Sequence, residues 1–189
     1  MKPSHVFDPA HIAVLESEDR KVWQNPDKIL SAVKLKPDWI AADFGCGSGY
    51  FTVLLAQKVK KVYAIDIQKE MLCFLEDKMR RLRISNIELR LSKPNEIPLE
   101  VEAVDFLLSV NTLHEFDDKA RMVKEMKRVV KHGGSLLIVD FKKQETGFGP
   151  PVKIRVAREK ARRLFEDSGF ALSNTKGLPY HYLLVFVNP

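Results

Sequence analysis

Three glycines stand at alternate positions just after a carboxylate, in the segment AADFGCGSGY (41–50). Gly45, Gly47 and Gly49 follow an apolar run and precede a helical pattern, so we place them in a turn from a strand into a helix. Glycine accepts a positive φ angle at little steric cost, and it lets a ligand lie against the main chain. A tight turn without a ligand is the alternative, but such a turn does not need three alternate glycines. We therefore predict a ligand-binding loop, in which Cys46 is a small packing residue.

Two carboxylates near this loop narrow the class of ligand. Asp66 ends the next apolar run, VYAID (62–66), and a carboxylate there can accept hydrogen bonds from both hydroxyls of a ribose. The alternative role for Asp66 is to cap the following helix. Asp43 precedes the first glycine by two positions, where it would repel a pyrophosphate and attract a cation. The spacing GxGxG, with Tyr50 next, also departs from the GxGxxG of dinucleotide sites. These features favour S-adenosylmethionine, which carries an amino group and a sulfonium, and disfavour a dehydrogenase.

A third group of polar residues follows a later apolar run, in SVNTLHEF (109–116). We expect Asn111 to contact the methionine part of the cofactor, and His114 and Glu115 to shape or deprotonate a methyl acceptor. Because a sulfonium is already a strong electrophile, a protein adds mainly positioning and deprotonation. The alternatives are that His114 caps or packs at a helix start and that Glu115 is a solvated acid in a first turn. One His and one Glu do not make a metal site, and we predict none.

The elements that must position these residues alternate between short apolar runs and longer helical patterns, which is typical of a parallel sheet covered by helices. Strands are predicted at 39–44, 62–66, 87–91, 104–110 and 135–141, and helices at 50–59, 69–82 and 118–130. Gly133 and Gly134 are expected to end the last of these helices. After a turn-rich break at 146–151 we predict one more helix, at 155–169, followed by the runs 170–178 and 180–187. No helix fits between these two runs, so they are expected to pair antiparallel.

Length and composition are those of one domain with small additions. The chain has 189 residues, of which 45% are hydrophobic. Without a long apolar stretch or a signal-like start, we predict a cytoplasmic protein with no membrane partner. Two cysteines suggest a reducing compartment, and Cys73 is expected to lie in the core. The net charge of +6 permits a nucleic-acid partner without requiring one. High charge hints weakly at a thermophilic source.

Together, the segments AADFGCGSG, VYAID and RVVKHGGSLLIVDF resemble the class I S-adenosylmethionine-dependent methyltransferase family. The resemblance is to its small-molecule branch, which includes the ubiquinone and menaquinone biosynthesis methyltransferases, and it runs from about Ile29 to Asp140. It implies an α/β, Rossmann-like three-layer sandwich with a seven-stranded, mostly parallel sheet in the order 3-2-1-4-5-7-6, the last strand antiparallel. It also implies that residues 29–189 bind S-adenosylmethionine and release S-adenosylhomocysteine, after an N-terminal helical segment at 1–28.

The resemblance also assigns roles to single residues. It puts Asp43 and the first two glycines beneath the methionine part of the cofactor and makes Asp66 the ribose ligand. Ile67 would pack on the adenine. Ser92 stands where the family often has an acidic side chain that reads the adenine amino group, so a hydroxyl or nearby main-chain groups would have to substitute.

Acceptor choice is expected to come from the parts outside the sheet. These are the N-terminal segment, with one or two short helices around 9–19 and 26–33, and the loop 142–155. We predict that the N-terminal segment is a lid over the cofactor, and a helix merely packed on the sheet edge is the alternative. Its candidate residues are His5, Phe7, His11 and Trp23. A small-molecule acceptor is favoured, with an RNA or protein methyltransferase, or a protein that binds the cofactor without transfer, as alternatives.

Overall fold

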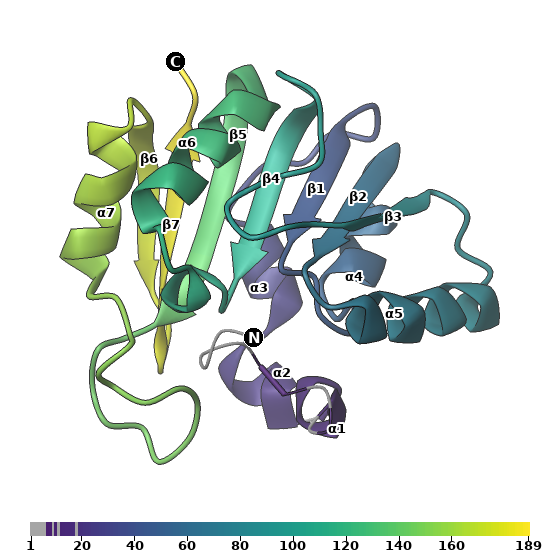
Figure 1. The fold of residues 1–189 in the computed structure, drawn as a ribbon, viewed down its shortest axis with the longest axis horizontal. Coiled ribbons are helices and arrows are strands. Elements are labelled where there is room, and N and C mark those ends of the chain that lie inside the picture. The colour runs from purple at the N-terminus through teal and green to yellow at the C-terminus, as the bar shows by residue number, and fades with distance from the viewer. Residues whose placement is uncertain (1–6, 9, 11, 18) are drawn as a thin grey trace.

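The computed structural model describes residues 7, 8, 10, 12–17 and 19–189, and its centre is a seven-stranded sheet in the order β3-β2-β1-β4-β5-β7-β6 (Figure 1). The strands are β1 Ile40–Phe44, β2 Lys61–Asp66, β3 Ile87–Leu91, β4 Val104–Val110, β5 Val130–Phe141, β6 Ala171–Gly177 and β7 His181–Val187. Pairing is parallel from β3 to β5, whereas β7 is antiparallel to both β5 and β6. The predicted strand order and the antiparallel last strand are confirmed.

Helices cover both faces of the sheet, because the central strands carry apolar side chains on both sides. The covering helices are α3 Pro26–Leu30, α4 Thr52–Ala56, α5 Lys69–Leu82, α6 Lys119–Val129 and α7 Arg158–Asp167. Leu108 of β4 belongs to one buried cluster together with Leu75 of α5. Its neighbour Leu107 belongs to the other, together with Met126 of α6 and Phe165 of α7. Successive residues of a strand face opposite sides, so α3, α4 and α5 form one outer layer and α6 and α7 the other.

Two further helices lie beyond the carboxyl edge of the parallel strands. They are α1 Ile12–Leu15 and α2 Asp19–Trp23, seen at the bottom of Figure 1 below the sheet. The loops that follow β1, β2, β4 and β5 open at this same edge, where sheets of this kind bind ligands. The N-terminal helices therefore face the predicted site.

The N-terminal region differs from the prediction of one or two helices. The described residues of this region form three short α-helices, α1, α2 and α3. The first ends at Leu15, inside the predicted helix at 9–19, and α2 begins at Asp19. His5 and His11 lie outside the described residues. The division at residue 28 stays a prediction, and it falls inside α3, where Ile29 and Leu30 are buried in the core of the sheet.

Three other expectations need correction. Helix α4 is shorter than the predicted 50–59, and α6 ends at Val129 without help from Gly133 or Gly134. Strand β5 starts immediately, because the β-branched Val130 pairs with Val104 and a bulge then absorbs the glycines. Cys73 is exposed on α5 and is not a core residue. Among the described residues, no helix has the length and apolar character needed to cross a membrane.

Candidate functional site

A cavity of about 800 Å³ opens at the carboxyl edge of the sheet, between the strand ends and the N-terminal helices. Nearly all of the residues predicted for the site line it, and they come from four different strand ends. They are Asp43, Gly45, Cys46, Gly47, Asp66, Ile67, Ser92, Asn111, His114 and Glu115. Gly49 is the one predicted residue that is absent from the cavity wall.

The three glycines all adopt positive φ angles, of 76°, 52° and 79° in chain order, but they serve different needs. A Cβ on Gly45 would lie 2.3 Å from Oγ1 of Thr112, and one on Gly49 would lie 2.3 Å from Cδ1 of Leu75. Close packing therefore requires glycine at both positions. A Cβ on Gly47 would meet only Leu15, at 3.5 Å. The prediction that bare backbone leaves room for a ligand thus applies to Gly47.

Asp66, at the end of β2, holds the glycine loop in place. Its Oδ2 accepts a hydrogen bond of 2.8 Å from the N–H of Gly47, and its Oδ1 accepts one of 2.9 Å from the N–H of Gln68. Burial raises the pKa of the Asp66 carboxyl, although these two backbone donors oppose the shift. A carboxylate offers about four acceptor positions, more than these backbone donors use, so Asp66 can organise the loop and bind a ribose together. The ribose role stays a prediction.

Asp43 is a buried carboxyl group beneath the same loop, with 2% of its surface exposed. Its Oδ2 accepts a hydrogen bond of 2.6 Å from the hydroxyl of Thr52. Burial raises the pKa of Asp43 to about 7, and the nearby charge of Asp66 adds to the effect, while Thr52 and Arg20 oppose it. Because burial disfavours the ionised form of Asp43, a cationic ligand beside it would stabilise the carboxylate.

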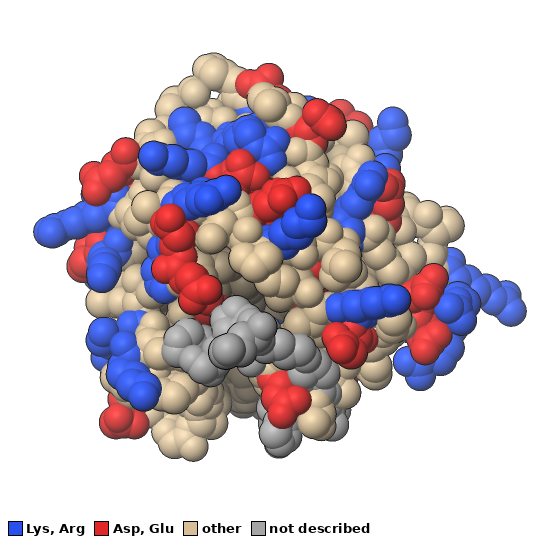
Figure 2. All heavy atoms as spheres, in the orientation of Figure 1, with Lys and Arg blue, Asp and Glu red and all other residues tan. Residues whose placement is uncertain are grey.

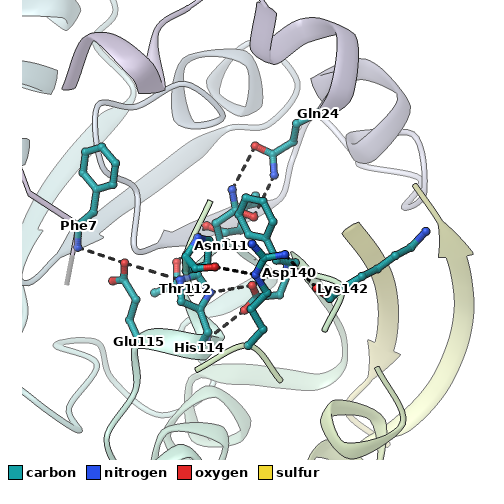
Figure 3. Close-up of polar contacts among 12 residues, drawn as sticks. Phe7, Gln24, Asn111, Thr112, His114, Glu115, Asp140 and Lys142 are labelled. Atoms are coloured by element: carbon teal, nitrogen blue, oxygen red, sulfur yellow. Dashed lines mark hydrogen bonds and ion pairs between the residues drawn. The ribbon is translucent and has the colours of Figure 1, made fainter. Parts of the chain in front are cut away.

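At the other end of the cavity, the carboxylate of Asp140 holds His114 in place. No role had been predicted for Asp140 from the sequence. Nδ1 of His114 lies 2.7 Å from Oδ1 of Asp140, and the backbone N–H of His114 donates to Oδ2 of Asp140 at 3.0 Å (Figure 3). Asp140 is fully buried near the end of β5. Burial alone would lower the pKa of His114, but the charge and hydrogen bond of Asp140 raise it above its ordinary value. His114 is therefore oriented by Asp140, which also favours the protonated form of its ring.

Glu115 lies on the open side of this histidine. Nε2 of His114 is 4.0 Å from Oε1 of Glu115, and the same oxygen accepts a hydrogen bond of 3.2 Å from the N–H of Phe7 (Figure 3). Burial raises the pKa of Glu115 to about 7, against the opposing charge of His114. Asp140, His114 and Glu115 form a row that ends in the cavity, and its last member can exchange a proton near neutral pH.

Asn111 adopts a left-handed backbone conformation, with φ 58°, at the end of β4. Its Oδ1 accepts a hydrogen bond of 3.1 Å from Nε2 of Gln24, which follows α2 (Figure 3). Asparagine tolerates this conformation better than most residues. The side chain of Asn111 thus connects the sheet to the N-terminal helices at the cavity wall.

Aromatic side chains from three separate segments enclose the wall beside His114. The rings of Trp23 and Phe148 are 5.1 Å apart, and those of Phe141 and Phe148 are 6.1 Å apart. The loop after β5 is held in place by the buried guanidinium of Arg155. This group donates to four carbonyl oxygens and one hydroxyl oxygen between residues 142 and 150. The loop that contributes Phe148 to the aromatic wall is therefore held in a defined conformation by hydrogen bonds.

Several residues in the cavity wall or directly behind it had no role assigned from the sequence. Asp140 had a usable signal, because it is a carboxylate at the carboxyl end of a predicted strand, in SLLIVDF. Arg20 and Thr112 had none, because their place depends on how distant segments fold together. Among the described residues, no group of three or more His, Cys, Asp or Glu side chains is arranged to hold a metal ion.

Comparisons with known proteins agree with this geometry. Residues 42–138, about half of the chain, match the family model described as "Methyltransferase domain". The fold resembles the crystal structure of a SAM-dependent methyltransferase from Aquifex aeolicus, with a TM-score of 0.91 and 31% identity. That likeness covers 97% of this chain and 100% of the other.

Two curated relatives are demethylmenaquinone methyltransferases. The protein from Bacillus velezensis is 29% identical over 136 residues, which are 70% of this chain and 58% of the relative. The protein from Bacillus mycoides is 29% identical over 131 residues, which are 68% of this chain and 54% of the relative. The chain therefore spans less than two thirds of the length of these relatives. The matched domain, the sheet order and the likeness along nearly the whole chain show that it belongs to the class I S-adenosylmethionine-dependent methyltransferases.

Proposed function

We propose that this protein transfers a methyl group from S-adenosylmethionine to a small-molecule acceptor. The observation that carries the proposal is the single cavity with two chemically different ends. One end has the open backbone of Gly47 between the buried carboxyl groups of Asp43 and Asp66. The other has an aromatic wall beside the paired His114 and Glu115. Volumes of roughly 300–1,000 Å³ are usual for ligand pockets, so the cavity is large enough for a nucleoside and a neighbouring acceptor.

The residues at the first end fit the cofactor in charge and shape. Asp43 would face the cationic methionine part, and the free lone pairs of Asp66 would accept the ribose hydroxyls. Ile67 lines the cavity and is 37% exposed, so its apolar surface is accessible for contact with a purine. Ser92 is held by a bond from its N–H to the carbonyl of Asp66 and supports the adenine end. When bound, S-adenosylmethionine supplies an electrophilic methyl group.

At the second end we assign Glu115 to receive the acceptor proton, with His114 beside it. A base is most effective when its pKa lies near the working pH, and burial brings the pKa of Glu115 to about 7. His114, held by Asp140, presents Nε2 to the same place, and Asp140 favours the form of the ring that carries a positive charge. This charge would stabilise the oxyanion of a deprotonated acceptor.

For the acceptor we propose a flat, largely apolar molecule with an acidic hydroxyl, of the quinol type. The aromatic wall of Trp23, Phe141 and Phe148 supports an apolar ring, and the names of the two Bacillus relatives support a quinone. Nucleic acid is less suitable, because Lys and Arg alternate with Asp and Glu over the face drawn in Figure 2, without a continuous basic surface. A cytoplasmic location is part of the proposal and rests on the sequence.

We also propose that residues 1–28 act as a lid over the cofactor. The support is a set of polar contacts from the described part of this segment to the loops after β1 and β2 and to helix α5. Glu16 accepts hydrogen bonds from Ser48 at 2.5 Å and from Lys78 at 2.7 Å, and the carbonyl of Phe7 accepts one from Gln68 at 2.9 Å. Deleting residues 1–24 should weaken cofactor binding or turnover, and unchanged values of both would argue against a lid.

The activity itself is tested with S-adenosylmethionine and 1,4-dihydroxynaphthalene under reducing conditions, followed by mass spectrometry for the gain of one methyl group. Metabolite extracts serve as a second source of acceptors. We expect methylation by the wild-type protein and a loss of at least tenfold in Glu115→Gln, whose amide cannot accept the proton. Binding of S-adenosylhomocysteine without methylation of any compound would leave a binding protein, and preference for NAD would refute the cofactor assignment.

A further inference from the structure

Arg20 is a buried cation in the cavity wall that the proposed chemistry has not used. It lies on α2 and is 6% exposed, next to the glycine loop. Its Nε donates to Oε1 of Gln24 at 2.8 Å, its Nη1 donates to the carbonyl of Leu15 at 2.8 Å, and its guanidinium carbon is 4.3 Å from the ring centre of Tyr50. A guanidinium has five N–H donors, and these two hydrogen bonds leave other donors of Arg20 for a ligand.

No carboxylate of the described residues forms an ion pair with Arg20. Burial lowers the pKa of Arg20 to about 10, against the opposing influence of Tyr50, Glu16 and Asp43, so the group stays charged at neutral pH. A buried charge is costly unless an opposite charge and hydrogen bonds satisfy it. Asp43 lines the same cavity, but its hydrogen bond goes to Thr52. One cation and one carboxyl group therefore flank the same space without pairing with each other.

This arrangement complements a zwitterion. An α-amino acid carries an ammonium and a carboxylate on one carbon, and it is best bound by an acidic group on one side and a planar guanidinium on the other. Building on the proposed function, we propose that Arg20 binds the α-carboxylate of the amino-acid part of S-adenosylmethionine while Asp43 receives its ammonium group. Arg20 is then a cofactor-binding residue supplied by the N-terminal segment.

The position of Arg20 also connects the cofactor to the closure of the N-terminal segment. Gln24 accepts from Arg20 through Oε1 and donates through Nε2 to Asn111 at 3.1 Å, so these side chains form a continuous hydrogen-bonded link from α2 to the end of β4. A carboxylate bound to Arg20 would hold α2 against the sheet. A nucleoside that lacks the amino-acid part would not.

Calorimetric titration with two ligands tests the assignment without any methyl acceptor. S-adenosylhomocysteine contains the amino-acid part, whereas 5′-methylthioadenosine lacks it. In Arg20→Met we expect the affinity for S-adenosylhomocysteine to fall roughly 10- to 100-fold, the size of a lost charged hydrogen bond, while the affinity for 5′-methylthioadenosine changes by less than about twofold. Arg20→Lys keeps the positive charge but not the planar guanidinium group, so its affinity for S-adenosylhomocysteine should fall less than that of Arg20→Met. Arg162→Met, on the exposed face of α7, is the matched control and should change neither affinity.

The outcomes separate this inference from the proposed function. If Arg20→Met lowers the affinity for both ligands equally, Arg20 only supports the fold. If it leaves the affinity for S-adenosylhomocysteine unchanged, the carboxylate of that ligand binds elsewhere. Either result overturns the assignment and leaves the cofactor in place. If the wild-type protein binds neither ligand, the proposed function fails as well. Should Arg20→Met not fold, the comparison of both ligands in Arg20→Lys decides the question by the same criteria.

Discussion

Replacing Asp43 by Asn should make the protein more stable at neutral pH and at the same time weaken its cofactor binding. The carboxyl group is 2% exposed, accepts one hydrogen bond from Thr52, and has no ion-pair partner among the described residues. An Asn of the same shape keeps an acceptor for Thr52 and removes the charge. The variant thus isolates the cost of holding an ionised group ready for a cationic ligand.

The size of the effect follows from the pKa of Asp43, which burial raises from 3.8 to about 7. Because the folded state binds the proton more tightly than the unfolded state, the stability present below pH 4 is lost as the pH rises towards 7. Each pKa unit corresponds to about 1.4 kcal/mol, so the full penalty is about 4 kcal/mol, of which about 3 kcal/mol develops above pH 5. Glu115 acts in the same direction, since its pKa is also raised to about 7, but its contribution is common to the wild type and the variant.

The assay is urea unfolding of wild type and Asp43→Asn at pH 5 and pH 8. We expect the free energy of unfolding of the variant to exceed that of the wild type at pH 8, and the difference between the two proteins to be about 3 kcal/mol smaller at pH 5. S-adenosylhomocysteine should bind the variant roughly 10- to 100-fold more weakly, because a charged hydrogen bond is lost. Asp77→Asn, on the exposed surface of α5, is the control and should change neither quantity. A variant that is less stable than wild type at pH 8, with the same pH dependence, would refute the reasoning.

Three other changes test the surrounding geometry. Gly45→Ala should lower the free energy of unfolding by about 2–5 kcal/mol in chemical denaturation, because its φ of 76° strains an Ala and the new Cβ would lie 2.3 Å from Thr112; an unchanged midpoint would contradict this packing. Asp140→Asn should lower the pKa of His114 in an NMR titration, since burial then acts without the neighbouring charge, and an unchanged pKa would show that the pair is unimportant. Arg155→Lys loses most of the donors that fix the loop after β5, so trypsin should cut that loop several-fold faster at a similar melting temperature, and wild-type cleavage rates would argue against this role.

Much of the sheet could be predicted because its signals are local. Buried strands read as short apolar runs, and β3 and β4 begin and end where those runs do. The lack of room for a helix before β7 correctly predicted an antiparallel neighbour, since parallel strands need a long crossover. The ends of helices and strands were harder to predict where glycines and strand pairing favoured different boundaries. Gly133 and Gly134 suggested a helix end, but the pairing of Val130 with Val104 decided the start of β5.

The ligand end of the site was predictable for the same reason. Asp43, Gly47 and Asp66 lie at consecutive strand ends of a parallel sheet, and the topology alone brings such residues to one edge. The glycine loop was interpreted too broadly, however. Gly45 and Gly49 are needed for contacts with Thr112 and Leu75, and a sequence pattern does not reveal which side chain will pack against a bare Cα.

The sequence by itself determined most strands and helices, and it placed the glycine loop and two carboxylates at the ends of predicted strands, because these follow from the periodicity of neighbouring residues. The strand order was implied by the resemblance to the methyltransferase family. Only the tertiary structure decided which charges lack partners and which side chains hold others in place. Helix α3 separates Arg20 on α2 from Asp43 on β1, and helix α6 and most of β5 separate His114 from Asp140. Burial and hydrogen bonding depend on such long-range packing, so the electrostatics of the site became visible when the chain was folded.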